Sequence, residues 1–177
     1  MTKVGLGWRE VGEADILSGI VSVSDPCYKK DTWCRKNDVH VKPGVYRCYS
    51  FLMVDSDYPE FGKRIWTNRI VHSDYDMDCL EYDDFYQVGV DSGLCGYFFN
   101  DIKEYPDRNA FLDFCDKIQE MDAETEWDDP TYRSYLLPEG FFTSSGYGDG
   151  GYPVFAARNE DGEIVSLEIS FIEERDE

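Results

Sequence analysis

Apolar and polar side chains alternate along several short runs of this chain, which is the pattern of β-strands that bury one face. Turn-forming residues separate the runs, such as Asp25-Pro26 after the first run and Asp91-Ser92-Gly93 between two later ones. Ile65 and Ile70 fall on opposite parities, so their run should contain a bulge or be buried on both faces. The predicted strands cover residues 19–24, 45–54, 64–71, 85–90, 94–99, 152–157 and 164–172.

One segment has the three- and four-residue spacing of an amphipathic α-helix, predicted over about residues 107–121. Asp107 stands where it can cap the helix N-terminus. The apolar face would consist of Phe111, Phe114, Cys115, Ile118 and Met121. No repeat, linker or domain boundary interrupts the chain. We therefore predict a mostly β fold, a single antiparallel β-sandwich-like domain over residues 1–177 with the helix packed on a face or edge.

The charge balance narrows the class of partner. The chain has 17 basic and 37 acidic residues, a formal net charge of −20 at pH 7. Such a charge repels phosphate backbones and anionic lipids, so direct binding to nucleic acid or to a membrane is disfavoured. It favours a basic protein surface, although high charge also serves solubility alone. One acidic run contains Asp74, Asp76, Asp78, Glu81, Asp83 and Asp84; the other contains Glu120, Asp122, Glu124, Glu126, Asp128 and Asp129.

The expected redox state of the six cysteines depends on the compartment of the protein. The sequence has no apolar stretch of membrane-spanning length and no signal-peptide hydrophobic region, so we expect a cytoplasmic protein with reduced cysteines. Cys48 and Cys95 lie within predicted strands and should be core residues. Cys27 and Cys34, even with His40, lack the spacing of a zinc site. A local contact between Cys27 and Cys34, or simple burial, is favoured.

A glycine-rich segment, residues 144–155, has four glycines within six positions. Gly146, Gly148 and Gly151 match the G-x-G-x-x-G pattern of dinucleotide-binding proteins. That pattern requires a helix to follow, whereas strand-forming residues follow here, so the dinucleotide hypothesis is rejected. The segment is interpreted as a turn that leads into a strand.

Motifs for metal binding and catalysis are incomplete. Asp74-x-Asp76-x-Asp78 copies the start of an EF-hand calcium loop, but Cys79 and Phe85 stand where the loop needs glycine and glutamate. His40 and His72 adjoin predicted strands, and neither belongs to a motif for nucleophilic catalysis. We therefore predict no cofactor and no defined metal-ligand set, and a non-enzymatic role is favoured.

Five short motifs follow one another along nearly the whole chain. They are Val-Ser-Asp-Pro-Cys-Tyr at 23–28, Thr-Trp-Cys at 32–34, Val-Lys-Pro-Gly-Val-Tyr at 41–46, Val-Gly-Val-Asp-Ser-Gly at 88–93, and Ser145 through Pro153. This ordered set resembles the bacterial and phage family known as domain of unknown function 4241. The resemblance implies no activity. It implies that Asp25, Asp91, Tyr147, Asp149 and the glycines beside them belong to recurring motifs.

The first functional hypothesis is a non-enzymatic acidic interaction protein, a phage or bacterial accessory protein or inhibitor. It would bind a basic surface of a protein partner in the manner of a nucleic-acid mimic. Aromatic residues among acids suit contacts with Lys and Arg. The predicted partner-binding residues are Asp74, Asp76, Asp78, Tyr82, Asp83, Asp84, Trp127, Asp128 and Asp129. If a phage encodes the chain, its location would be the host cytoplasm.

Two alternatives stay open. One is a small-ligand or divalent-metal-binding domain, with or without hydrolytic activity, in which three turns bring aspartates together. Its residues would be Asp25, Asp91, Ser92, Tyr147 and Asp149. The other is a structural phage accessory domain in which the same aspartates only fix turns, since Asp commonly hydrogen-bonds to turn backbone.

Overall fold

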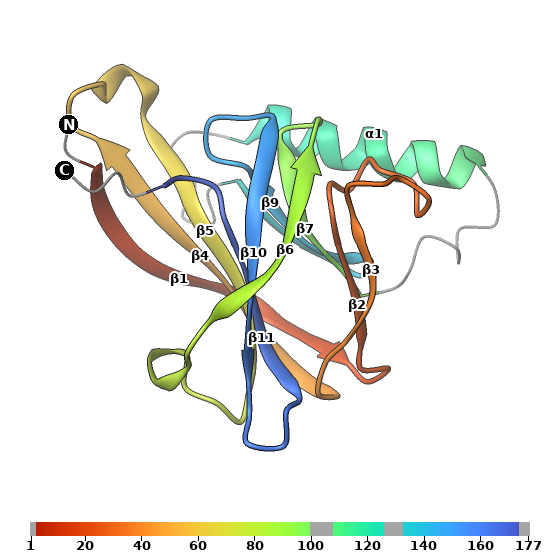
Figure 1. Ribbon diagram of the computed structural model, residues 1–177. Coiled ribbons are helices and arrows are strands. Elements are labelled where there is room, and N and C mark those ends of the chain that lie inside the picture. Colours follow the sequence, from red (N-terminus) through yellow and green to blue (C-terminus); the bar gives the residue numbers. More distant parts are fainter. Residues whose placement is uncertain (1–2, 100–107, 126–132, 174–177) are drawn as a thin grey trace.

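The computed structural model describes residues 3–99, 108–125 and 133–173 of the 177-residue chain. Two antiparallel sheets face each other as an open sandwich (Figure 1). Sheet A has the strand order β1 (Lys3–Ile16), β4 (Gly44–Asp55), β5 (Lys63–His72), β11 (Ile164–Ser170), β10 (Gly150–Arg158) and β6 (Asp83–Val90). Sheet B has the order β3 (Lys36–His40), β2 (Ile20–Ser24), β7 (Leu94–Phe98), β9 (Gly140–Ser144) and β8 (Ser134–Leu137). The predicted mostly β, antiparallel sandwich-like class is confirmed.

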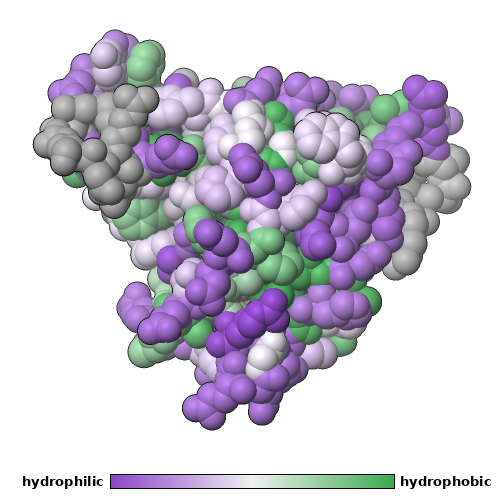
Figure 2. Space-filling view, in the orientation of Figure 1, coloured by the Kyte–Doolittle hydropathy of each residue, from purple (hydrophilic) through white to green (hydrophobic). Residues whose placement is uncertain are grey.

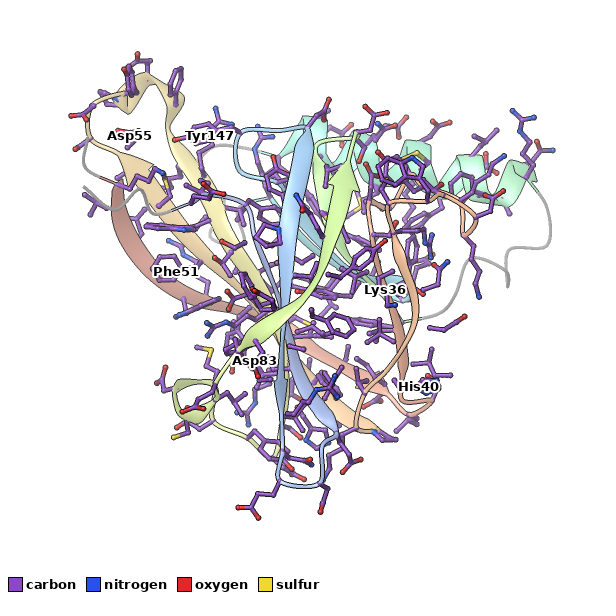
Figure 3. All side chains as sticks on the ribbon, in the orientation of Figure 1. Lys36, His40, Phe51, Asp55, Asp83 and Tyr147 are labelled. Atoms are coloured by element: carbon purple, nitrogen blue, oxygen red, sulfur yellow. A yellow bond between two sulfur atoms is a disulfide. The ribbon has the colours of Figure 1, made fainter. Side chains whose placement is uncertain are left out.

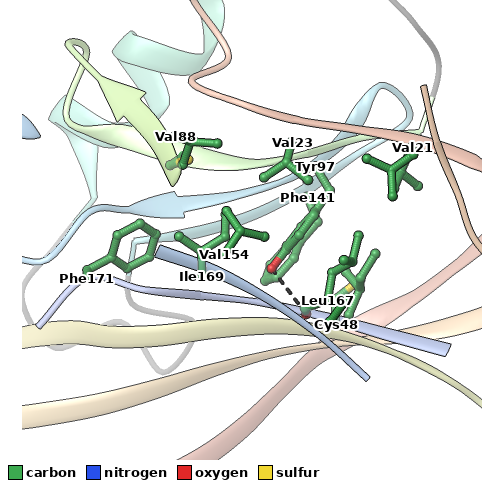
Figure 4. Close-up of a cluster of buried hydrophobic side chains, with 14 of the residues drawn as sticks. Val21, Val23, Cys48, Val88, Tyr97, Phe141, Val154, Leu167, Ile169 and Phe171 are labelled. Atoms are coloured by element: carbon green, nitrogen blue, oxygen red, sulfur yellow. Dashed lines mark hydrogen bonds between the residues drawn. The ribbon is translucent and has the colours of Figure 1, made fainter. Parts of the chain in front are cut away.

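The apolar faces of the two sheets meet in the main core (Figure 4). A polar network crosses it. The Tyr97 hydroxyl donates to Asn68 Oδ1 at 2.8 Å, and Asn68 Nδ2 donates to Thr143 Oγ1 at 2.9 Å and to the Cys95 carbonyl at 3.2 Å. Asn68 and Tyr97 have no exposed surface, so these hydrogen bonds replace the water that both side chains lose on folding. The network thereby links sheet A to sheet B.

A bulge on β5 explains why two isoleucines of opposite parity reach the same core. Phe51 of β4 pairs with Thr67 and Leu52 pairs with Ile65, so Trp66 is an extra residue on β5. Ile65 and Ile70 are both fully buried as a result. The predicted bulge is confirmed.

The helix α1 (Arg108–Glu124) covers the outer face of sheet B. Its side chains Phe114 and Ile118 join a second apolar cluster with Leu94, Phe98, Tyr135 and Phe142 of the sheet. The predicted helix is confirmed over its described part, while the expected cap, Asp107, lies outside the described residues. No helix of the described ranges is long and apolar enough to cross a membrane.

The cysteines correct the sequence-based expectation. Cys27, after β2, forms a disulfide with Cys115 of α1, 88 positions away. Neither a fully reduced set nor a contact between Cys27 and Cys34 is therefore right. Cys34 is buried beside Gly89, whose backbone N–H donates to the Cys34 carbonyl at 3.0 Å. Cys48 and Cys95 are buried core residues, as predicted.

Sheet A has no helix over its outer face within the described residues. Its edge strand β1 pairs with β4 along its whole length, with register shifts between Gly5 and Gly7 and between Glu10 and Gly12. Such irregularities bend a strand and increase its twist. In Figure 1, β1 curves along the left side of the molecule beside β4. Aromatic and charged side chains lie together on the outer face of sheet A, among them Trp8, Phe51 and Arg69.

Candidate functional site

Asp25 has no exposed surface and lies directly after β2. Its Oδ1 accepts hydrogen bonds from the Cys27 backbone N–H at 2.8 Å and from the Ser92 hydroxyl at 2.7 Å. Its Oδ2 accepts from the backbone N–H groups of Asp91 and Ser92 at 2.8 and 2.7 Å. Both oxygens are thus occupied by protein donors, and the carboxylate joins the end of β2 to the turn between β6 and β7.

The glycine-rich segment forms the turn between β9 and β10. Gly146 and Gly148 have φ values of +65° and +122°, which favour glycine. The Ser145 backbone N–H donates to the Gly93 carbonyl at 3.0 Å, so this turn lies beside the turn between β6 and β7. The predicted strand entry is confirmed, since β10 begins at Gly150.

The residues predicted for a small-ligand site lie at these neighbouring turns, and the printed contacts join only some of them. Asp25 and Ser92 are in direct contact, and Asp91 contributes its backbone N–H. Tyr147 is 51% exposed and contacts the β4–β5 hairpin, and Asp149 is exposed. The described residues contain no group of three or more His, Cys, Asp or Glu that could hold a metal ion. Within this set, Asp25, Asp91 and Ser92 are joined by hydrogen bonds that fix turns.

The first acidic run lies on the connection from β5 to β6 and on the first two residues of β6. We call residues 73–84 the acidic connection. Its acidic residues are all exposed, namely Asp74, Asp76, Asp78, Glu81, Asp83 and Asp84. Figure 3 places Asp83 where β6 begins, and Figure 2 shows mainly hydrophilic residues at this lower end of the molecule. The other predicted partner-binding residues, Trp127, Asp128 and Asp129, lie outside the described residues.

Local hydrogen bonds fix the backbone of the acidic connection. His72 Nδ1 accepts from the Asp74 backbone N–H at 3.1 Å, so the ring carries its proton on Nε2, which donates to the Pro43 carbonyl at 3.0 Å. Asp76 caps the 3-10 turn η2 (Met77–Cys79) by accepting from the Asp78 backbone N–H at 3.0 Å. The carboxylates are therefore carried on an ordered segment.

Two tyrosines of the acidic connection turn back onto the molecule. The Tyr75 hydroxyl accepts from Asn159 Nδ2 at 3.1 Å, and Lys42 Nζ lies 5.6 Å from the centre of the Tyr75 ring. The Tyr82 hydroxyl shares a 2.7 Å hydrogen bond with Ser166 Oγ. Burial raises the pKa of Tyr82, partly opposed by the Ser166 hydrogen bond, so the phenol is neutral at physiological pH. Tyr82 thus acts as an anchor and not as an exposed contact.

Arg69 occupies the centre of the outer face of sheet A. Its guanidinium carbon lies 4.3 Å from the centre of the Trp8 ring and 4.4 Å from that of Tyr82. Its Nε donates to Glu168 Oε2, and the two side chains are only 17% and 13% exposed. Cation–π contacts and a mostly buried ion pair together fix this arginine in place.

A groove of about 840 Å³ lies on the same face, and Trp8, Arg69 and Glu168 form part of its lining. Four aromatic residues line it, namely Trp8, Phe51, Trp66 and Phe155. Strand register explains the arrangement: Phe51 of β4 lies opposite Trp8 of β1, and Phe155 of β10 lies opposite Glu168 of β11. Phe51 and Phe155 thus lie on opposite sides of the groove, and the polar side chains between them come from the central strands β5 and β11.

The sequence hypotheses missed every residue of this groove. The available signal was parity along β4: Cys48 and Leu52 point to the core, yet an aromatic residue, Phe51, occupies the opposite face. A solvated sheet face normally alternates to polar residues at such positions. Aromatic residues on the outward parity were therefore the sign of a second, concave apolar surface.

Fold and site together describe an open β-sandwich protein with one helix-covered sheet and one aromatic, partly concave sheet face. Residues 14–169 match the family described as Protein of unknown function (DUF4241), and the chain belongs to this family. The resemblance inferred from the five motifs is thereby confirmed. No curated protein and no solved structure matches the chain.

Proposed function

We propose that the chain is a non-enzymatic interaction protein that binds a basic surface of a protein partner through the acidic connection. The observation that carries this proposal is the exposure of every acidic side chain between Asp74 and Asp84 on one ordered segment. The β10–β11 hairpin adds exposed acids at the same end, because Asn159 hydrogen-bonds to Tyr75 of the acidic connection. These added acids are Glu160, Asp161 and Glu163.

Charge at this end supports association in two ways. The net charge of −20 and the clustered carboxylates attract a basic partner over a distance of roughly 8 Å at physiological ionic strength and speed encounter. Single exposed ion pairs contribute only about 0–1 kcal/mol each, so binding strength has to come from several pairs formed at once. An ordered segment reduces the conformational entropy lost on binding.

The test replaces Asp74, Asp76 and Asp78 by Asn. This change removes three charges but keeps the η2 cap, because an Asn side-chain oxygen can accept the same backbone hydrogen bond. Wild type and variant are immobilised, bacterial lysate proteins retained by the wild type are identified by mass spectrometry, and the tightest binder is purified and titrated by calorimetry. We expect the variant to bind it at least tenfold more weakly at low salt, about 1.4 kcal/mol, with a smaller difference at high salt.

A charge-matched control comes from α1, on the other side of the sandwich. Asp113, Asp116 and Glu120 are exposed there, and changing them to amides removes the same charge. This control should bind like the wild type. Equal weakening by both triple variants would mean that binding depends on the net charge and not on the acidic connection. A complex that persists undiminished in about 1 M salt would contradict the proposal.

A further inference from the structure

The groove on the outer face of sheet A shares no lining residue with the acidic connection proposed for protein docking, although Tyr82 of that segment packs on Arg69. Its volume of about 840 Å³ falls in the usual range of small-molecule sites, roughly 300–1,000 Å³. Phe51, labelled in Figure 3, lies on the left flank of the molecule between β1 and the front strands. No described helix covers this sheet face, so a ligand can reach the aromatic groove from solvent.

The floor of the groove is a polar block flanked by rings. Glu168 and Ser170 of β11 lie opposite Arg69 and Thr67 of β5, which places four polar side chains in two adjacent cross-strand pairs. Phe155 adjoins this block on the β10 side, and Phe51 adjoins it on the β4 side. Any occupant must therefore present apolar surface to the rings and polar groups to the floor.

The groove is locally neutral within a strongly acidic protein. The charged residues that line it are Lys3, Arg69, Glu168 and Glu173, two of each sign. An anionic ligand would meet the repulsion of the −20 charge without a surplus of basic groups. A cationic ligand would meet no unpaired carboxylate on the floor, because Glu168 already binds Arg69. The charge balance selects an uncharged ligand.

Hydrogen bonding in the groove has to come from side chains. The floor strands β5 and β11 are central strands of sheet A, paired on both sides, so their backbone groups are already engaged. An extended peptide binds sheets by adding to a free edge, and the floor strands have none; the free edge of sheet A on this side belongs to β1. The Arg69 guanidinium packs against the rings of Trp8 and Tyr82, and its N–H groups donate in its own plane. The floor thus offers hydrogen-bond donors and acceptors side by side, from the hydroxyls of Thr67 and Ser170, the Arg69 guanidinium and the Glu168 carboxylate.

We propose that this groove binds a neutral carbohydrate, with sugar rings against Trp66, Phe51 and Phe155 and sugar hydroxyls on the Arg69–Glu168 pair, Thr67 and Ser170. A sugar ring has two apolar C–H faces and a rim of hydroxyls that both donate and accept. That combination matches apolar walls around a neutral floor of mixed hydrogen-bonding capacity. The open groove suits an oligosaccharide chain and not an enclosed monosaccharide.

The experiment titrates the full chain with a panel of neutral tetrasaccharides built from glucose, N-acetylglucosamine, xylose or mannose. Tryptophan fluorescence and calorimetry give the affinity, since two of the four tryptophans line the groove. We expect at least one tetrasaccharide to bind. Trp66→Ala should weaken that binding tenfold or more. Ser170→Ala removes only a hydroxyl, so it disturbs the fold less, and it should weaken binding two- to fivefold. Affinity should stay within twofold between low salt and about 1 M salt, because the groove carries no net charge.

Trp33→Ala is the matched control, because Trp33 is 88% exposed and does not line the groove. It should leave the affinity unchanged, and thermal unfolding should show that all three variants fold. Two outcomes overturn the proposal: no tetrasaccharide binds at about 10 mM, or Trp66→Ala and Ser170→Ala bind as the wild type does. Preferential binding of an apolar decapeptide in the same titration would assign the groove to peptides instead. The triple Asn variant of the acidic connection should bind the sugar normally, so the two proposals fail separately.

Discussion

Asp25 has no exposed surface, whereas the turn aspartates Asp91 and Asp149 are exposed. Burying a carboxylate costs much free energy unless hydrogen bonds replace its hydration. Four hydrogen bonds from Cys27, Asp91 and Ser92 do so. The residue therefore stabilises two turns at once.

Asp25→Asn should lower the free energy of unfolding by about 2–4 kcal/mol, because an amide nitrogen would then face backbone N–H donors. Urea denaturation at neutral pH measures this loss. Asp149→Asn, an exposed change of the same kind, should stay within about 0.5 kcal/mol of the wild type. Equal effects of the two substitutions would mean that the hydrogen bonds of Asp25 contribute nothing to stability.

At this scale the sequence could identify candidate residues but not their contacts. A turn aspartate such as Asp25 was recognisable as either a ligand or a turn-fixing residue, because both roles use the same side chain. Arg69 and Glu168 are separated by 99 positions, and only strand register puts them opposite each other. A pattern within one strand carries no information on which strand becomes its neighbour. The strand pairings that build the groove were therefore beyond reach, although Phe51 on the outward parity of β4 was a sign of an apolar outer face, while the acidic connection is a local run that the sequence shows directly.

Among the elements, α1 is held to the sandwich by packing and by the Cys27–Cys115 disulfide. A disulfide that closes so long a loop restricts the unfolded chain strongly, in the chain-entropy model. Structural disulfides belong to oxidising compartments or to protein oxidised after synthesis. The cytoplasmic location inferred from the sequence stays a prediction, and this bond stands against it.

Removing the disulfide with Cys27→Ser and Cys115→Ser should lower the free energy of unfolding by about 2–4 kcal/mol. Urea denaturation of the double variant, and of wild type with reductant, measures this effect. Cys79→Ser, at an exposed free cysteine, should leave stability unchanged. Denatured wild type without reductant should expose four thiols, matching the four free cysteines, and a count of six would contradict the bond.

Regular periodicity identified several elements from the sequence, although β5 was found in spite of its bulge. α1 and the strand that contains Cys48 were predicted because apolar residues recur regularly along them. The long strand β1 was missed, because Gly5, Gly7 and Gly12 interrupt its alternation at the two register shifts. Regular periodicity fails where a strand is bent, and here the bent strand borders the groove.

In the molecule as a whole, ionisable side chains lie between the two sheets. Tyr97, Tyr46, Cys48 and Cys95 have no exposed surface. Burial is the main cause that raises the pKa of each of these groups above its usual value. The folded protein keeps these protons at a pH where the unfolded chain releases them.

Stability from these groups should therefore be constant up to about pH 8 and then fall as pH rises through the unfolded pKa values, near 8.5 for Cys and 10 for Tyr. Each group that stays protonated only in the folded state adds a slope of about 1.4 kcal/mol per pH unit. Urea denaturation between pH 7 and 11 measures the curve. Tyr97→Phe should be less stable at neutral pH, since it loses the hydrogen bond to Asn68, yet should show a shallower alkaline decline. If Tyr97→Phe lost stability with pH as steeply as the wild type does, groups other than Tyr97 would cause the alkaline loss of stability.

The bent edge strand β1 has a consequence for how molecules of this protein behave toward one another. A straight edge of 14 residues would offer a long row of unpaired backbone groups to a second molecule, which is how sheets propagate into fibrils. Two register shifts interrupt that row, and charged side chains such as Arg9, Glu10 and Glu13 lie along it. The curvature that borders the groove thus also protects the protein from edge-to-edge polymerisation.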